Sequence, residues 1–218
     1  MSQTAVFRAT EADAYFRRNL EECATVSTQQ IPRNVALYSQ YVQSHHKILE
    51  VGCAAGRNLH LLRQLTGCTA FGLEPSQEAV RSGASLFPDI SVSVGTAERL
   101  EFPDDAFDFV LFGFVLCWID RDLLPRVVFE ADRVLKSGGF LGITDFDADV
   151  PTSRPYKHQE GLVSCKLDYS RLFTAFPQYV LVEKISHSHH GESFHPDPQE
   201  RLSSVVLYKD LTAGYARG

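Results

Sequence analysis

The chain has 218 residues, of which 44% are hydrophobic and 22% are charged, and this is the composition of a globular domain that can bury a core. A net charge of −6 and the lack of any Lys/Arg-rich run argue against a nucleic-acid partner. The longest apolar run, 110–119, is too short to span a bilayer, and the five cysteines form no C-x-x-C pair, so we expect a cytoplasmic protein with reduced thiols and no membrane association.

The first part of the chain predicts two helices ahead of any strand. Residues 10–22 place Thr10 and Asp13 three positions apart, as in a capping box, with apolar side chains further along. Pro32 opens a second helical stretch that runs up to a pair of histidines. Because the sheet does not need these helices, we expect residues 1–46 to form an N-terminal helical extension that closes over a site as a lid.

Residues 47–58 indicate a short buried strand, a tight turn and the start of a helix. Apolar residues surround Glu50, and Gly52 and Gly56 then flank a run of small residues. Leucines at a spacing of three predict the helix that follows. Glycine permits a positive φ and a close approach of a ligand, and the turn is expected to present free N–H groups at the helix N-terminus.

Further strand and helix signals follow in order. We expect strands at 69–74, 90–94, 107–114 and 140–146, and helices at about 76–87 and 122–136. The helix 122–136 is amphipathic, and Ser137–Gly138–Gly139 is expected to end it with a glycine C-cap. The alternation of strands and helices predicts a parallel sheet with helices on both faces.

The pattern changes after residue 146. Residues 147–167 have no clear period and are expected to cap the open side of a site. A short helix at 168–176 precedes strands at 179–185 and 202–208, and these two strands predict an antiparallel hairpin because no crossover helix fits between them. The predicted fold class is α/β: a Rossmann-like, seven-stranded, mostly parallel sheet over residues 47–218, with an antiparallel C-terminal hairpin and helices on both faces.

Two glycine patterns compete at the first turn. A dinucleotide-binding turn needs G-x-G-x-x-G, but from Gly52 the second glycine is Ala54 and the third is Arg57, whose bulk would obstruct helix packing. The pattern present is acid-x-Gly-x-small-x-Gly, from Glu50 to Gly56. An NAD-dependent oxidoreductase is therefore the less favoured alternative. Ala54 stands where a glycine is usual, and we expect its methyl group to be tolerated at a negative φ.

This turn resembles motif I of the class I S-adenosylmethionine-dependent methyltransferases, of the small, methyltransferase type 11-like kind. The stretches 72–76, 95–98, 107–110 and 133–139 resemble later positions of that family, in the same order and at similar spacing. The resemblance covers roughly residues 47–146. It implies an enzyme that takes S-adenosyl-L-methionine as cofactor and methylates a nucleophilic atom of a small-molecule acceptor. A non-catalytic regulator or scaffold that binds the same cofactor stays open as an alternative.

In this resemblance Glu74 holds the cofactor ribose and residues 95–98 meet the adenine. The resemblance implies the following cofactor-binding residues: Glu50, Gly52, Cys53, Ala54, Gly56, Asn58, Glu74, Pro75, Ser76, Thr96, Ala97, Glu98, Phe112, Gly113 and Phe114. The charges point the same way independently, because Glu50, Glu74 and Glu98 all fall at carboxyl ends of predicted strands. Three acids around one crevice suit a sulfonium cation and sugar hydroxyls, and they would repel a pyrophosphate.

Methyl transfer needs an aligned acceptor, exclusion of water and, for an acceptor that carries a proton, a base. We expect Asp145 or His158 to be that base, with core or surface roles as the alternative. The expected acceptor-binding residues are Tyr15, Arg18, Trp118, Phe146, Tyr156 and Lys157. This set favours an acceptor with an apolar or planar body and an anionic group, with residues 147–167 as an acceptor-side cap.

Four histidines lie close together near the last two strands: His187, His189, His190 and His195. Only Glu192 is near enough in sequence to complete a tetrahedral ligand set, so we expect a solvated loop and no metal. The oligomeric state stays open.

Overall fold

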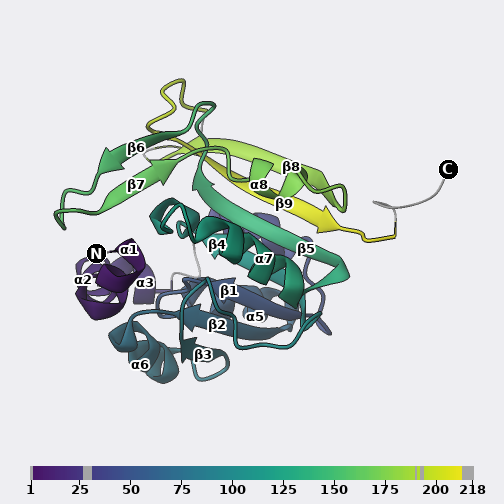
Figure 1. Cartoon of the computed structure of the whole chain (residues 1–218). Helices are drawn as coiled ribbons and strands as arrows, with labels where there is room; N and C mark the ends of the chain where they lie inside the picture. Colours follow the sequence, from purple (N-terminus) through teal and green to yellow (C-terminus); the bar gives the residue numbers. More distant parts are fainter. Residues whose placement is uncertain (1, 27–30, 190, 192–193, 213–218) are drawn as a thin grey trace.

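The computed structural model describes residues 2–26, 31–189, 191 and 194–212 (Figure 1). Its main sheet has seven strands in the order β3-β2-β1-β4-β5-β9-β8. These strands are β1 Lys47–Val51, β2 Thr69–Glu74, β3 Ser91–Val94, β4 Phe107–Gly113, β5 Leu135–Phe146, β8 Tyr179–Ser188 and β9 Arg201–Lys209. The pairs from β3 to β5 are parallel, and β9 runs antiparallel between β5 and β8. The predicted fold class is confirmed.

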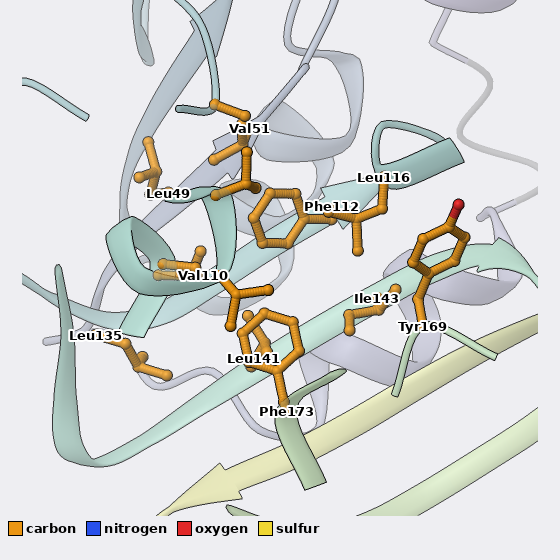
Figure 2. Close-up of a cluster of buried hydrophobic side chains, with 14 of the residues drawn as sticks. Leu49, Val51, Val110, Phe112, Leu116, Leu135, Leu141, Ile143, Tyr169 and Phe173 are labelled. Carbon is orange, nitrogen blue, oxygen red and sulfur yellow. The ribbon is translucent and has the colours of Figure 1, made fainter. Parts of the chain in front are cut away.

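Apolar cores lie on both faces of the sheet because successive residues of a strand point to opposite sides. Val110 and Phe112 of β4 belong to one core, whereas Phe109 and Leu111 belong to the other. Figure 2 shows the first core, with Phe112 in the middle of the buried side chains. The helices that supply these cores are α4 Arg33–Ser39 and α5 Arg57–Thr66 on one face and α7 Leu124–Val134 on the other.

The strand order reverses between β1 and β4. Strand β1 pairs with β2 on one side and with β4 on the other, and the chain reaches β4 only after β2, α6 Gln77–Leu86 and β3. In open α/β sheets, ligands bind outside the carboxyl ends of the strands at such a switch point. The topology therefore places the candidate site beyond Val51 and Gly113.

The helix predicted to end in a glycine cap is shorter than expected. Helix α7 ends at Val134, and Leu135 is already extended. Leu135 is buried and pairs with Phe107 of β4, so the chain enters β5 at once. The predicted C-cap at residues 137–139 is wrong, and Gly138, with φ of 86°, lies within the irregular first part of β5.

The N-terminal helical segment begins earlier than predicted. It consists of α1 Gln3–Val6, the π-helical turn η1 Phe7–Glu11, α2 Ala12–Arg18 and α3 Leu20–Ala24. Asp120, from the loop after β4, accepts hydrogen bonds from the backbone N–H groups of Gln3 and Thr4 at 2.8 and 3.0 Å. This carboxylate caps the first helix from far along the chain, and local sequence cannot reveal such a cap.

Residues 147–167, expected to be irregular, contain a hairpin. Strands β6 Thr152–Pro155 and β7 Val163–Lys166 pair antiparallel as a separate sheet, and α8 Arg171–Thr174 follows. Figure 1 shows this hairpin on the same side of the molecule as the N-terminal helices. Strand β8 continues to Ser188, past the predicted end at residue 185, and so includes His187. Within the described residues, no helix is both long enough and apolar enough to cross a bilayer.

Candidate functional site

Two adjoining cavities open at the carboxyl edge of the sheet, with volumes of about 130 and 300 Å³. Tyr15, Gly113 and Phe114 line both, so the cavities meet at the end of β4 below the N-terminal helices. The first is also lined by Thr4, Phe7, Ala12, Val51, Gly52, Leu73, Glu74, Pro75, Gly95, Thr96, Ala97, Glu98, Val115, Trp118 and Ile119. The second is also lined by Glu22, Cys23, Pro32, Arg33, Asn34, Cys53, Ala54, Arg57, Asn58, Thr144, His187 and Ser204.

The turn after β1 adopts left-handed conformations at alternate positions. Gly52, Ala54 and Gly56 have φ of 74°, 49° and 87°. A Cβ on Gly52 would come within 2.2 Å of Val115 Cγ2, so glycine is needed there for close packing as well as for φ. The methyl group of Ala54 was expected to be tolerated at a negative φ, and the observed φ does not meet that condition. A left-handed alanine costs roughly 1–2 kcal/mol, which this turn offsets with hydrogen bonds.

Those hydrogen bonds use several N–H groups of the turn itself, whereas the expected free N–H groups belong to the start of α5, which has no side-chain cap. Gly52 N–H donates to the Leu73 carbonyl at 2.7 Å, and Cys53 N–H donates to the same oxygen at 3.3 Å. Gly56 N–H donates to the Cys53 carbonyl, and Ala54 N–H donates to the Glu74 carboxylate. Most donors of residues 52–56 are therefore used within the protein, and the carboxylates beside the turn remain as acceptors for a ligand.

Glu74 is held rigidly at the end of β2. Its Oε2 accepts from Ala54 N–H and its Oε1 from Ser76 N–H, both at 2.9 Å. Burial raises the pKa of Glu74 to about 7, against the lowering effect of these two donors. Each carboxylate oxygen has a further lone pair, so the group can accept two more hydrogen bonds from a ligand in the first cavity. Ser76, predicted to cap α6, does so through Ala79 N–H.

Glu50 has one carboxylate oxygen that receives no hydrogen bond from the described residues. Asn58 Nδ2 donates to its Oε1 at 3.1 Å, but Oε2 is buried and accepts from no group among the described residues. Burial raises the pKa of Glu50 to about 7. Gly113 faces this carboxylate, since a Cβ there would meet only Glu50 Oε1, at 3.5 Å. A buried carboxylate of this kind favours a cationic or hydroxyl donor as ligand.

Of the remaining predicted cofactor residues, Asn58 lines the second cavity, whereas Gly56 and Ser76 line neither. Pro75, Thr96, Ala97 and Glu98 line the first cavity, and Cys53 lines the second. Phe112 does not line either, because its side chain is buried in the core under α7. The first cavity thus combines an apolar wall with acids at its rim, which suits a flat base joined to a sugar.

Phe114 lies where the cavities meet and is strained. Its φ is 54°, uncommon for a bulky side chain, and its N–H donates to the Thr144 carbonyl at 2.8 Å. Its ring stacks on His189, with ring centres 5.8 Å apart, and lies 6.3 Å from Phe146. Strain of this kind is typical of ligand sites.

The two expected bases do not reach the cavities. Asp145 is buried, and its oxygens accept from Cys117 N–H at 3.2 Å and Phe146 N–H at 2.8 Å. Burial raises the pKa of Asp145 to about 7, but Asp145 lines neither cavity, and the neighbouring Thr144 takes the side of the strand that faces the second cavity. His158 is exposed in the β6–β7 turn and stacks edge-on against Tyr156. Neither position fits the expected role.

Only two of the six expected acceptor residues line a cavity. Tyr15 and Trp118 line cavities. Tyr156 packs on Trp118 and accepts from Arg18 Nη2 at 3.0 Å, so it joins the β6–β7 hairpin to α2 outside the cavity lining. Three further residues also lie outside the lining: Phe146, Lys157, which is exposed, and Arg18, which pairs with Glu11.

Sequence reasoning missed the polar wall of the second cavity. Thr144 lies opposite Ser204 in the β5–β9 register, and His187 lines the same cavity from β8. The available signal was a pair of serines inside the otherwise apolar strand β9. His189 stacks on Phe114, and His190 and Glu192 lie outside the described residues. Among residues 2–26, 31–189, 191 and 194–212, no three His, Cys, Asp or Glu side chains gather as a metal site.

The N-terminal helices cover both cavities and are anchored at each end. Asp13 of α2 accepts from Ser76 Oγ at 2.6 Å and from Glu78 N–H at 3.1 Å. At the other end, the Gln3 side chain accepts from Val163 N–H of β7 at 2.6 Å and donates to the Trp118 carbonyl at 2.8 Å. The helices therefore join α6 to the β6–β7 hairpin across the mouth of the site.

Comparison with known proteins agrees with this geometry. Residues 49–143 match the family model of a methyltransferase domain. Methyltransferase GfsG of Streptomyces halstedii is 35% identical over 112 residues, which are 48% of this chain and 39% of that protein. A demethylmenaquinone methyltransferase of Lysinibacillus sphaericus is 32% identical over 114 residues, 50% of this chain and 48% of that protein. Residues 49–143 are therefore a methyltransferase domain, and the chain has the fold of class I methyltransferases. The matches span less than half the length of these two curated relatives.

The likeness in fold extends beyond the matched segment. A Burkholderia thailandensis 1,6-didemethyltoxoflavin-N1-methyltransferase, solved with 1,6-didemethyltoxoflavin and S-adenosylhomocysteine bound, has a TM-score of 0.67 at 15% identity, over 95% of this chain and 88% of that one. The family's cofactor is S-adenosyl-L-methionine. The residues present fit it, because Glu50 Oε2 has no donor among the described residues and Glu74 has spare lone pairs, while the cofactor carries an ammonium group and ribose hydroxyls.

Proposed function

We propose that this protein is an S-adenosyl-L-methionine-dependent methyltransferase that methylates a small-molecule acceptor. The observation that carries the proposal is the pair of buried, aligned carboxylates, Glu50 and Glu74, at the ends of β1 and β2. Their charge favours a cationic, hydroxyl-rich ligand over a pyrophosphate, which weighs against an NAD-dependent oxidoreductase. The second cavity, of about 300 Å³, has the size of a small-molecule site.

The roles we assign follow from position. Glu74 binds the ribose hydroxyls, and Glu50, oriented by Asn58, binds the ammonium group. Pro75 and residues 95–98 hold the adenine in the first cavity. The bound cofactor supplies an electrophilic methyl group on a sulfonium, and the protein aligns an acceptor with it and excludes water.

The acceptor is proposed to be small because the relatives that name one, a demethylmenaquinone methyltransferase and a didemethyltoxoflavin methyltransferase, name small molecules. Residues 1–46 act as the lid and residues 147–167 as part of the acceptor-side cap. The hydrogen bonds of Asp13 and Gln3 support this arrangement, since they tie the N-terminal helices to both rims of the site.

Calorimetry with S-adenosylmethionine and S-adenosylhomocysteine tests cofactor binding, and a screen of metabolite pools for S-adenosylhomocysteine formation tests catalysis. We expect binding at one site per chain and turnover with at least one pool. Binding without turnover in any pool would favour a regulator or scaffold, and no binding would overturn the proposal.

A further inference from the structure

A chain of four polar side chains crosses the wall of the second cavity. Tyr38 OH lies 2.7 Å from Thr144 Oγ1, which lies 3.0 Å from Ser204 Oγ. Ser204 Oγ in turn lies 3.3 Å from His187 Nε2. Four different elements supply these residues: α4, β5, β9 and β8. Thr144, Ser204 and His187 line the cavity.

The chain has a direction. Tyr38 is buried in the core, and a phenol is a stronger donor than an aliphatic hydroxyl, so it donates to Thr144. Thr144 then donates to Ser204, and Ser204 donates to His187 Nε2. In this order Tyr38 donates, Thr144 and Ser204 each accept once and donate once, and the chain ends on a nitrogen that must accept. Such chains strengthen cooperatively in a buried setting.

His187 is accordingly a neutral imidazole whose Nε2 is unprotonated. Burial lowers its pKa first, and the positive charge of Arg33 on α4 adds to this effect. His189 also disfavours the charged ring, whereas Asp147 and the neighbouring Ser188 backbone favour it. Glu22 and Arg57 also line this cavity. The balance leaves a proton acceptor in a cavity next to the proposed cofactor site.

The two cavities have separate tasks under the proposed function. The first contains Glu74 and the apolar wall that suits adenosine, and the turn residues Cys53 and Ala54 border the second. The cavities meet at Gly113 and Phe114, and the Thr144–Ser204–His187 side of the second cavity is formed by β5, β9 and β8, away from that turn. This side is the one left for the acceptor.

We infer that the second cavity binds an acceptor whose nucleophile carries a proton, a hydroxyl or an N–H group, and that His187 receives this proton through Ser204. The inference rests on the proposed methyltransferase function. In the step, the acceptor's oxygen or nitrogen forms a bond to the methyl carbon while the carbon–sulfur bond breaks and its electron pair returns to sulfur. The acceptor's proton passes to Ser204 Oγ as the Ser204 proton passes to His187 Nε2, which leaves a methylated acceptor, a thioether and an imidazolium.

The first test follows the ring itself and needs no turnover. NMR of ring-labelled protein saturated with S-adenosylhomocysteine should show His187 neutral at pH 7, protonated at Nδ1. Phenol added as a probe should shift the signals of His187 and the Thr144 methyl group in a saturable way. A charged ring, or no shift at either signal with phenol, would overturn the inference.

The second test separates a base from a structural residue. With phenol as acceptor, His187→Gln and Ser204→Ala should lower kcat by roughly 10²–10⁴-fold and roughly tenfold or more, respectively, with unchanged affinity for S-adenosylhomocysteine. With 4-nitrophenol, which ionises without help at a pH of about 8, both losses should shrink to a few-fold. The control His45→Gln changes an exposed histidine before β1 and should behave as wild type.

The outcomes also distinguish a failure of the role given to His187 from a failure of the proposed methyltransferase function. If wild type and His187→Gln turn over phenol equally, or lose activity equally with both phenols, His187 is not the base although the methyltransferase function stands. If neither phenol is methylated, the NMR shifts alone decide whether the inference about His187 stands. If S-adenosylhomocysteine itself does not bind, the proposed function fails first.

Discussion

Replacing Glu74 with glutamine should weaken cofactor binding much more than it weakens the fold. The carboxylate accepts one backbone N–H on each oxygen, both at 2.9 Å, and keeps a lone pair on each for a ribose hydroxyl. Glu74→Gln retains one accepting oxygen and turns the other into a donor. One hydrogen bond to a charged group is therefore lost, roughly 1.5–3 kcal/mol, which is about 10- to 150-fold in Kd.

The stability of the fold should change less, because two effects oppose each other. The new NH₂ group meets a backbone N–H at Ala54 or Ser76, which is unfavourable. The substitution also removes a carboxyl group whose charged form is penalised by burial, as its pKa of about 7 shows. We therefore expect an unfolding temperature within a few degrees of wild type, whereas calorimetry with S-adenosylmethionine shows the loss of affinity.

The matched control is Glu101→Gln, which changes an exposed glutamate paired with Arg99 outside both cavities. It should bind the cofactor as wild type does. An unchanged Kd for a folded Glu74→Gln variant would refute the ribose assignment and with it the orientation of the cofactor across the two cavities.

Three further outcomes are expected. Ala54→Gly relieves a left-handed alanine at φ of 49°, so the free energy of unfolding from denaturant titration should rise by roughly 0–1 kcal/mol, and a fall of about 1 kcal/mol or more would contradict the strain argument. Glu50 and Glu74 have pKa values raised from 4.5 to about 7, so between these values the folded state holds more protons than the unfolded one, and stability without cofactor should fall as pH rises from about 4.5 to above 7. Cofactor binding near pH 6.5 should release protons, which calorimetry in buffers of different ionisation enthalpy would detect or exclude. Asp120→Ala removes both hydrogen bonds to the first helix, roughly 1 kcal/mol of capping, so hydrogen exchange over residues 3–18 should quicken, and unchanged exchange would show that the lid is held elsewhere.

The cofactor half of the site could be predicted because its residues belong to short, contiguous stretches of the sequence. A parallel strand, its turn and the next helix are contiguous, and the carboxyl ends of parallel strands meet at one edge of the sheet. Glu50 and Glu74 therefore had to lie near one another once β1 and β2 were recognised as neighbours. The conformation of Ala54 was not accessible in this way, since it depends on a hydrogen bond to a carboxylate on the next strand.

The acceptor half depends on register between distant strands. Asp145 was expected to face the site, but side chains alternate along a strand, and it is Thr144 that faces the second cavity. The choice between these two neighbours is settled by the pairing of Thr144 with Ser204 on β9, which enters the sheet between β5 and β8. His187 was likewise assigned to a loop because the end of β8 shows no change in sequence pattern.

The strained backbone positions connect the two halves. Two of the three described non-glycine residues with positive φ, Ala54 and Phe114, lie at the ends of β1 and β4 on either side of the strand-order switch. Each is held by one hydrogen bond to the adjacent strand: Ala54 to the Glu74 carboxylate and Phe114 to the Thr144 carbonyl. Conformations of this kind persist only where the surroundings hold them. Glu74 thus has two tasks, since the carboxylate that would bind the ribose also fixes the turn beside the second cavity. Thr144 also has two, since its carbonyl fixes Phe114 while its hydroxyl belongs to the chain that ends at His187. The position of the cofactor and the shape of the acceptor wall therefore depend on the same pair of turns.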